Sequence, residues 1–318
     1  MPRHVPALDP DAAALAEQRR AQRPGGMRSV GLEAVRAGLE SMPHPAEMPK
    51  MASVEDHDIN CDHGRLPIRV YSPTSDAQLP AVVYFHGGGM VMGTNHSFEP
   101  FARNIAEYTG HRVFAVGYHL APEHPPPGQI EDAWRATEWV ARQADDLGVL
   151  PDRISVAGDS AGGTLAALVA LRARDRGGPR LLCQVLMYGG LDRDLAAGSV
   201  LKFPDSVGLT RDDIVYLHGL ARAGAPDSPG EDEIPAYTAD LRGLPSAIVA
   251  VGELDPLRDW SERYAARLRD AGVQTTLTRY PGVAHGFLMQ MNHLARGRLA
   301  LAEIAGILRA KAAHPLPW

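Results

Sequence analysis

The chain is short of cysteine, of long apolar runs and of any excess of positive charge. Its two cysteines, Cys61 and Cys183, lack the spacing of metal ligands and form one pair at most, which excludes a disulfide framework. No apolar stretch reaches membrane-spanning length, and residues 1–20 contain no apolar segment like that of a secretory signal, so we expect a cytoplasmic protein without a membrane span. Acidic residues outnumber basic ones by 38 to 32, and the arginines are dispersed among them, which argues against nucleic acid as a partner.

What the chain does have is length and a regular alternation of segments. Its 318 residues suffice to bury a large core without disulfides or metals. Apolar runs predict strands at 54–60, 67–71, 80–85, 113–118, 153–157, 182–188, 246–251 and 275–280. Helical spacing predicts helices at 11–23, 27–41, 130–143, 164–174, 259–271 and 295–311. This alternation predicts an α/β fold, with a mostly parallel, doubly wound sheet and helices on both faces.

Shorter features punctuate this pattern. Turns are expected at 24–26, between the first two helices, and at 62–64, between the first two strands. An irregular stretch at about 192–239, with one amphipathic segment at 211–221, interrupts the alternation. It follows the carboxyl end of a strand, which is the edge where open α/β sheets form their ligand crevice.

The most informative segment is Gly158-Asp159-Ser160-Ala161-Gly162-Gly163, between a predicted strand and a predicted helix. A Gly-x-Ser-x-Gly sequence in that context is typical of a nucleophile elbow, a turn so tight that the serine backbone is strained. Small residues must flank the serine, because a Cβ two positions before or after it would collide with the neighbouring strand or helix. The turn holds the hydroxyl at the positive end of the following helix. We therefore predict that Ser160 is a nucleophile.

A serine needs a base, a group that orients the base, and a site for the oxyanion. Three glycines after His86 follow a buried strand directly and would let backbone N–H groups approach a substrate carbonyl, as would the N–H of Ala161. Of the 13 histidines, His285 lies in a loop beyond the strand at 275–280, at the same sheet edge as Ser160.

The loop after the strand at 246–251 offers three acids as the orienting carboxylate. Asp259 is expected to cap the helix that it begins. Strand alternation would turn Glu253 away from Asp255, so Asp255 is the preferred candidate and Glu253 stays the alternative. The order Ser160, Asp255, His285 along the chain is that of α/β-hydrolases.

With these residues in view, the chain resembles the hormone-sensitive lipase family of α/β-hydrolases, in its bacterial carboxylesterase branch. The resemblance runs from about residue 52 to the C-terminus. It rests on five motifs in order: His86-Gly87-Gly88-Gly89, Tyr118-His119-Leu120-Ala121-Pro122-Glu123-His124-Pro125, Gly158-Asp159-Ser160-Ala161-Gly162-Gly163, Asp255-Pro256-Leu257-Arg258-Asp259 and His285-Gly286-Phe287.

The resemblance implies an α/β-hydrolase fold with a helical cap and assigns the site. Residues 1–50 would form an N-terminal cap segment, and residues 51–318 the catalytic domain, with the cap insert at about 192–239. Ser160 would be the nucleophile, His285 the base and Asp255 its partner. The backbone N–H groups of Gly88, Gly89 and Ala161 would form the oxyanion hole, with His86 holding the glycine loop. No cofactor or metal is expected.

Two departures from the family bear on this assignment. His119 stands where the family usually has arginine, which puts the usual salt-bridge support of that loop in doubt. Met90 follows the three glycines in place of an aromatic residue, with Met92 nearby. These methionines are consistent with an adaptable acyl pocket or, equally, with gap-filling in the core.

The predicted function is a serine carboxylesterase that hydrolyses short- to medium-chain acyl esters through an acyl-enzyme. An acyltransferase, an amidase or deacetylase, or a lyase of specialised metabolism could use the same triad, because fold and triad do not exclude them. A non-catalytic ligand receptor on this scaffold is less favoured, since such proteins usually lose the catalytic histidine and this chain keeps His285. The expected partner is a small acyl ester, and an edge-strand homodimer is compatible with the fold.

Overall fold

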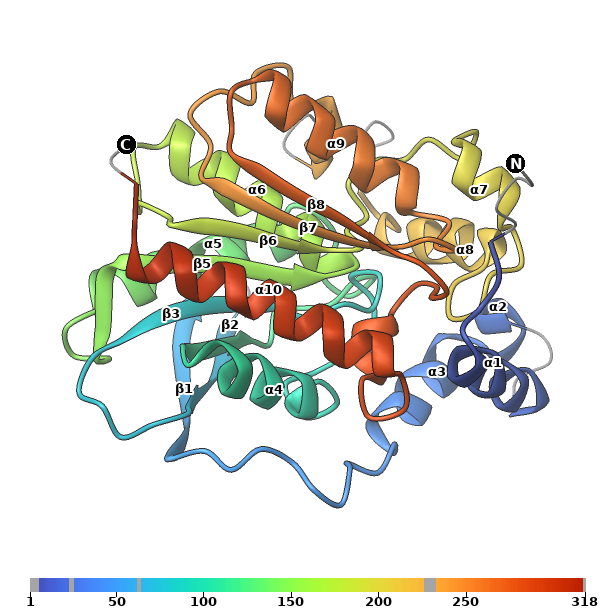
Figure 1. Ribbon diagram of the computed structural model, residues 1–318, viewed down its shortest axis with the longest axis horizontal. Helices are drawn as coiled ribbons and strands as arrows, with labels where there is room; N and C mark the ends of the chain where they lie inside the picture. The colour runs from blue at the N-terminus through green and yellow to red at the C-terminus, as the bar shows by residue number, and fades with distance from the viewer. Residues whose placement is uncertain (1–5, 23–25, 62–63, 226–232, 317–318) are drawn as a thin grey trace.

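The computed structural model describes residues 6–22, 26–61, 64–225 and 233–316. Within them, eight strands form one sheet in the order β1-β2-β4-β3-β5-β6-β7-β8 (Figure 1). The strands are β1 Ser53–Cys61, β2 Gly64–Ser72, β3 Leu79–Phe85, β4 Arg112–Val116, β5 Val149–Asp159, β6 Cys183–Met187, β7 Ser246–Gly252 and β8 Thr275–Tyr280. Neighbours from β4 to β8 run parallel, whereas β2 is antiparallel to both β1 and β4. The predicted mostly parallel sheet is confirmed.

Helices cover both faces of the sheet (Figure 1). One face carries α4 Glu99–Thr109 and α10 Ala295–Ala313, and the other carries α5 Gly128–Arg142, α6 Ala161–Asp175 and α9 Arg258–Asp270. The doubly wound arrangement is therefore as predicted, and it places the carboxyl ends of β3, β5, β7 and β8 at one edge.

The sequence of β3 shows why both faces are covered. Ala81, Val83 and Phe85 belong to the core beneath α5, α6 and α9, and Val82 and Tyr84 belong to the core beneath α4 and α10. Each of these side chains is at most 1% exposed. A strand with apolar residues at every position must be buried on both sides, so both layers of helices are required.

Helix α4 is a large element that the sequence pattern did not predict, since no element was expected between residues 85 and 113. Its apolar residues, including Phe101 and Ile105 four positions apart, are buried against the sheet. Pro100 lies in the first turn of the helix, where its missing N–H costs no helical hydrogen bond, and the helix ends at Gly110, whose φ of 68° is the left-handed conformation that ends many helices.

The N-terminal segment forms three helices, α1 Pro10–Gln22, α2 Gly26–Val30 and α3 Leu32–Glu40. The second predicted helix, 27–41, is divided at Gly31, whose φ of 86° is left-handed. The expected turns at 24–26 and 62–64 fall partly outside the described residues.

The insert after β6 contains α7 Gly198–Lys202, α8 Arg211–Ala221 and the 3₁₀ turn η2 Pro235–Tyr237. Helix α8 coincides with the predicted amphipathic segment and begins with a capping box between Thr210 and Asp213. It packs against α2, where the Met27 N–H donates to the Asp213 carboxylate at 2.9 Å and Arg28 pairs with Asp212 at 3.1 Å. The N-terminal segment and the insert are thus in contact (Figure 1).

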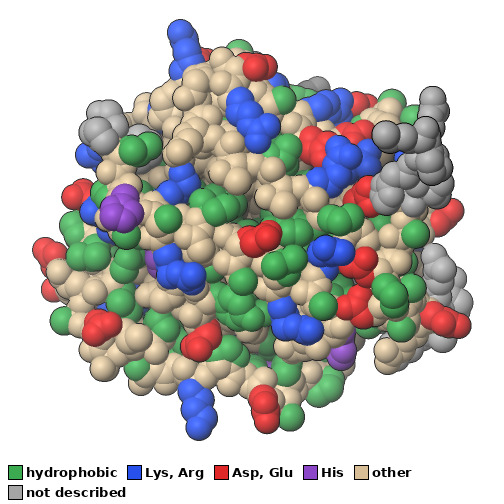
Figure 2. Space-filling model, viewed as in Figure 1, with side chains coloured by type: hydrophobic (Ala, Val, Ile, Leu, Met, Phe, Trp, Pro, Cys, Tyr) green, Lys and Arg blue, Asp and Glu red, His purple; other side chains and the backbone are tan. Residues whose placement is uncertain are grey.

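The surface agrees with the composition of the chain. On the face shown in Figure 2, positive and negative side chains are intermixed and neither sign forms a continuous patch. Among the helices of the described residues, none is long and apolar enough to cross a membrane.

Candidate active site

Ser160 lies on the sharp turn between β5 and α6. Its φ of 52° and ψ of −117° are strained for a residue with a side chain. The Ser160 N–H donates to the Met187 carbonyl at 2.9 Å, which anchors the turn to the neighbouring strand. A Cβ on Gly158 would collide with the backbone of Gly162, and one on Gly162 with the backbone of Phe85. The glycines on either side of Ser160 are therefore required by close backbone approach.

His285 and Asp255 continue from Ser160 as one chain of hydrogen bonds. The distance from Ser160 Oγ to His285 Nε2 is 2.9 Å, and that from His285 Nδ1 to Asp255 Oδ2 is also 2.9 Å. Because a carboxylate only accepts, Nδ1 carries the proton, and Nε2 is left to accept from the serine hydroxyl. Asp255 is fully buried, and its other oxygen accepts from the Leu257 N–H at 2.7 Å.

The loops that carry Asp255 and His285 are packed tightly on each other. The Leu254 N–H donates to the Val283 carbonyl at 3.0 Å, and the Glu253 N–H donates to the Tyr280 carbonyl at 2.8 Å. A Cβ on Gly252 would lie 2.7 Å from the same Val283 oxygen. This contact fixes the distance between the two loops. It is Asp255, and not the alternative Glu253, whose carboxylate bonds to His285.

The glycine loop after β3 lies beside this chain of hydrogen bonds. Gly88 and Gly89 have φ values of 104° and 64°, and a Cβ on Gly88 would collide with the Met92 carbonyl. The Gly88 carbonyl accepts from the N–H groups of Val91 and Met92, each at 3.1 Å, which closes the turn. Within the described residues, the N–H groups of Gly88, Gly89 and Ala161 have no intramolecular acceptor.

His86 holds the glycine loop through ring stacking and a hydrogen bond. Its ring is stacked between Phe98 and Tyr118, with centroid distances of 4.9 and 4.3 Å, and its Nδ1 donates to the Gly87 carbonyl at 2.8 Å. Burial lowers the pKa of His86 to about 4, so the ring is neutral near pH 7. A neutral, stacked imidazole fits the expectation that His86 holds the loop and exchanges no proton.

Asp159, which the sequence analysis gave no role, supports the same loop from the elbow. Its Oδ1 accepts from the Gly87 N–H at 2.9 Å and from the Tyr84 hydroxyl at 2.6 Å. Burial raises the pKa of this carboxyl to about 6. Because Asp159 directly precedes Ser160 in the chain, the same turn positions the serine hydroxyl and, through the Asp159 carboxylate, holds the glycine loop in place.

Arg36, on α3, is a second supporting residue that no motif signalled. Its guanidinium donates to the Val91 carbonyl at 2.6 Å, to the Ala121 carbonyl at 2.8 Å, and to both oxygens of Glu123 at 2.7 and 2.9 Å. It therefore joins the glycine loop to the segment that follows β4. His119, in that same segment, bonds to Asp132 of α5 at 2.8 Å. Together these contacts provide the support that the missing family arginine put in doubt.

The expected role of Asp259 is wrong. Leu257 is the N-cap of α9, and Asp259 lies in the first turn without capping its own helix. Its Oδ2 instead accepts from the Ser199 N–H at 2.8 Å, at the start of α7 in the insert. The Ser199 hydroxyl in turn donates to the Pro256 carbonyl at 2.7 Å. The carboxylate thus joins the insert to the Asp255 loop, a contact across 60 residues that local capping rules do not reveal.

Met90 and Met92 are both buried, with exposed fractions of 9% and 6%, and both belong to the core beneath α5, α6 and α9. Met90 has a φ of 67°, which continues the left-handed turn of the glycine loop. Leu217 of α8 lies over this loop, since a Cβ on Gly89 would be 3.1 Å from its side chain.

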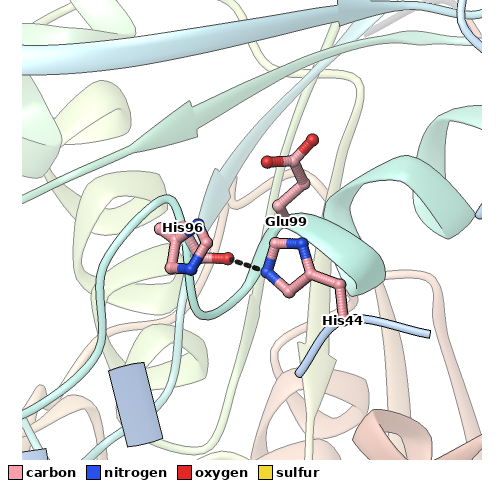
Figure 3. Close-up of side chains that lie close together, drawn as sticks. All are labelled: His44, His96 and Glu99. Carbon is pink, nitrogen blue, oxygen red and sulfur yellow. Dashed lines mark hydrogen bonds between the residues drawn. The ribbon is translucent and has the colours of Figure 1, made fainter. Parts of the chain in front are cut away.

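Figure 3 shows a separate group of ionisable side chains, His44, His96 and Glu99, whose ligand atoms lie within 4.8 Å of one another. The His44 Nε2 donates to the His96 carbonyl at 3.0 Å. Glu99 is engaged by two guanidinium groups, that of Arg103 at 2.7 Å and that of Arg69 at 3.3 Å. Two positive charges on one carboxylate disfavour a cation there. A cavity of about 460 Å³ beside His96 and Arg69 contains none of Ser160, Asp255 and His285 in its lining.

Comparison with known proteins identifies the family. A family model described as alpha/beta hydrolase fold matches residues 82–289, more than half of the chain. The chain belongs to the α/β-hydrolase family. Among its relatives in this family, carboxylesterase NlhH of Mycobacterium tuberculosis is 40% identical over 265 residues, covering 81% of this chain and 82% of the relative. The ethyl acetate hydrolase of Pseudomonas putida is 33% identical over 233 residues, covering 71% and 73%.

A solved α/β-hydrolase structure agrees over almost the whole chain. The hyperthermophilic esterase of Pyrobaculum calidifontis superposes with a TM-score of 0.85 and 36% identity, covering 96% of this chain and 99% of the esterase. These relatives confirm the predicted hormone-sensitive lipase family and the predicted enzyme class. The protein is a carboxylic ester hydrolase.

Proposed function

We propose that this hydrolase is a serine carboxylesterase with Ser160 as nucleophile, His285 as base and Asp255 as the partner of His285. The observation that carries the proposal is the continuous hydrogen-bond chain from Ser160 through His285 to the buried Asp255. A serine hydroxyl bonded to a neutral imidazole nitrogen is ready to lose its proton as it attacks. The carboxylate on Nδ1 holds the imidazole in the tautomer that can take that proton.

The geometry supports a two-step hydrolysis. Ser160 Oγ attacks the ester carbonyl carbon while His285 Nε2 takes the hydroxyl proton, and the carbonyl oxygen becomes an oxyanion. When the tetrahedral intermediate collapses, the carbon–oxygen bond to the alcohol breaks and His285 returns the proton to the leaving alcohol. The acyl group is then bonded to Ser160. A water that gives its proton to His285 attacks the acyl carbon and releases the carboxylic acid, and the proton returns to Ser160.

In this proposal the N–H groups of Gly88, Gly89 and Ala161 form the oxyanion hole. Two observations support this assignment. These N–H groups lie on the two turns that flank Ser160, and within the described residues they have no intramolecular acceptor. Donors held in place before the reaction stabilise the charge that develops on the substrate oxygen, and each is worth about 3 kcal/mol. Asp159, His86 and Arg36 would keep the glycine turn rigid.

We further propose that residues 1–50 and the insert at about 192–239 together form a cap over a catalytic domain of residues 51–318. The contacts between α2 and α8 support the idea that these two segments act as one unit. The position of Leu217 over Gly89 supports a cap that closes directly above the oxyanion loop. Such a cap would exclude water and shape the acyl pocket.

The proposed substrates are short- to medium-chain acyl esters. One relative is named for the hydrolysis of ethyl acetate, which supports a short acyl group. The buried Met90 and Met92 beside the glycine loop, with Leu217 above it, provide apolar and adaptable surroundings that suit a somewhat longer chain.

The test is hydrolysis of p-nitrophenyl esters from acetyl to decanoyl by the wild type and by Ser160→Ala. We expect the variant to lose turnover of every ester and labelling by a fluorophosphonate, because among the described residues the hydroxyl bonded to His285 is that of Ser160. Ser53→Ala, which removes a half-buried serine on β1 that bonds to Glu55, is the matched control and should keep both activities. Wild-type turnover by Ser160→Ala would eliminate the triad assignment.

A further inference from the structure

Three side chains with metal-ligating atoms meet on the side of the molecule formed by β1 and α5. Cys61 lies at the end of β1, His119 in the segment after β4, and Asp132 on α5, and their ligand atoms lie within 4.8 Å of one another. Cys61 Sγ is 4.0 Å from His119 Nδ1, and His119 Nδ1 is 2.8 Å from Asp132 Oδ2. The residues are separated by 58 and 13 positions, so no sequence spacing announces the group.

The carboxylate of Asp132 provides a second, independent observation. The residue is 1% exposed, and its Oδ2 accepts both the His119 N–H at 2.9 Å and the His119 ring at 2.8 Å. Its Oδ1 is buried and has no hydrogen-bond partner among the described residues. A buried carboxylate oxygen without a partner costs free energy unless a water or an ion satisfies it.

We propose that Cys61, His119 and Asp132 bind one divalent transition-metal ion of the zinc type. Thiolate, imidazole and carboxylate are the protein ligands that zinc prefers. Tetrahedral zinc would place the thiolate sulfur about 3.6 Å from the imidazole nitrogen, and that nitrogen about 3.3 Å from the carboxylate oxygen. The distances of 4.0 and 2.8 Å, the second of which is measured to Oδ2, require shifts of about half an ångström each, and an ion held by both carboxylate oxygens would also satisfy Oδ1. The centroid of the His124 ring lies 4.7 Å from that of the His119 ring.

The present hydrogen bonds of Cys61 and His119 show which interactions a metal ion would replace. The Cys61 thiol donates to the Gly64 carbonyl at 3.3 Å, and the His119 ring donates to Asp132. Metal binding would release both protons and join the end of β1 to α5 and to the segment after β4. The contrast with the group formed by His44, His96 and Glu99 is electrostatic. Two arginines pair with the carboxylate there, whereas Asp132 bonds to His119.

The test uses the full-length protein, freed of metal by a chelator and titrated with Co²⁺ at neutral pH. We expect one equivalent to bind and to give the sulfur-to-cobalt charge-transfer absorption of a thiolate ligand, which Zn²⁺ then removes by displacement. Cys61→Ser should abolish this absorption. His119→Gln and Asp132→Asn should weaken binding at least tenfold. Cys183→Ala removes the other, buried cysteine and should change neither, and His96→Gln controls for the group in Figure 3.

A second measurement keeps the proposal testable if a variant folds poorly. Zn²⁺ at a hundredfold excess over its Kd should raise the melting midpoint of the wild type by about 4 °C. The shift should be absent in Cys61→Ser, while Ser160→Ala should show it in full. The proposal is overturned if the wild type gives no thiolate absorption, if that absorption survives in Cys61→Ser, or if Asp132→Asn binds as tightly as the wild type. Esterase activity is not part of the readout, so this outcome is independent of the triad.

Discussion

At the scale of single residues, the proposed role of Asp255 depends on its burial and on its two hydrogen bonds. One carboxylate oxygen meets the His285 ring and the other meets the Leu257 N–H, so the group has little freedom to turn. An asparagine has the same shape but would present an amide N–H to Nδ1, which favours the tautomer that cannot accept the serine proton.

We therefore expect Asp255→Asn to lower kcat by up to about 10⁴-fold, by analogy with other triads, with a much smaller effect on KM. Steady-state kinetics with p-nitrophenyl butyrate measures both constants. Glu253→Gln, in the same loop, is the matched control and should stay close to wild type. If Asp255→Asn keeps the wild-type kcat while Glu253→Gln loses it, the orienting carboxylate is Glu253.

Asp159 makes the stability of the protein depend on pH in an unusual direction. Burial raises its pKa from 3.8 to about 6 in the folded protein. The unfolded chain loses the proton near pH 3.8, whereas the folded chain keeps it until about pH 6. In this window the folded state binds more protons, so the free energy of unfolding contributed by Asp159 falls as the pH rises.

We expect the wild type to lose about 3 kcal/mol of stability relative to Asp159→Asn as the pH rises from about 3 to 7. Asparagine keeps an acceptor for Gly87 and Tyr84, so the comparison isolates the charge. Urea unfolding of both proteins at several pH values provides the measurement. The difference in stability between the two proteins cancels the contributions of other groups that titrate. One of these is His86, whose lowered pKa makes the stability rise as the pH rises. A difference that does not change with pH would contradict the raised pKa.

At the scale of elements, α3 acts on the glycine loop through Arg36. Its bonds to the carbonyls of Val91 and Ala121 and to Glu123 reinforce the junction between two segments that are also joined by the Ala121 N–H, which donates to the Met90 carbonyl at 2.9 Å. The Val91 N–H in turn bonds to the Gly88 carbonyl, so Arg36 is one step from a proposed oxyanion donor.

Replacing Arg36 by glutamine should lower kcat about tenfold, because a displaced donor loses part of its roughly 3 kcal/mol of transition-state stabilisation. KM should change less, since Arg36 contacts the loop and not the proposed acyl pocket. Glu123→Gln leaves both backbone bonds of Arg36 in place and should have a smaller effect. Far-ultraviolet circular dichroism checks that both variants are folded. An unchanged kcat in Arg36→Gln would show that the loop needs no support from α3.

At the scale of the whole molecule, the structural features that can be predicted from the sequence are those that depend on residues close together in the chain. The apolar positions of β3 require burial on both faces, and the glycines around Ser160 require a tight turn, so sheet, layers and elbow could be inferred. Contacts between residues that are far apart in the sequence could not be inferred. Arg36 is 55 residues from Val91, and Asp259 is 60 from Ser199, and neither pairing has a local pattern. Asp159 did carry a signal, since it precedes the proposed nucleophile Ser160 in the motif, but its partner Gly87 is fixed only by strand order.

The position of the first residues also matters beyond their own helices. The Asp9 N–H donates to the Gly282 carbonyl, three positions before His285, and the Asp9 carboxylate pairs with Arg296 at 3.0 Å. With Arg36, the N-terminal segment thus touches both the glycine loop and the His285 loop. The N-terminal segment is consequently not an independent module. A chimera that takes its first fifty residues from a related esterase would change the turnover rate as well as the substrate preference. Segment swapping that is meant to change selectivity alone would have to preserve the contacts of both Asp9 and Arg36.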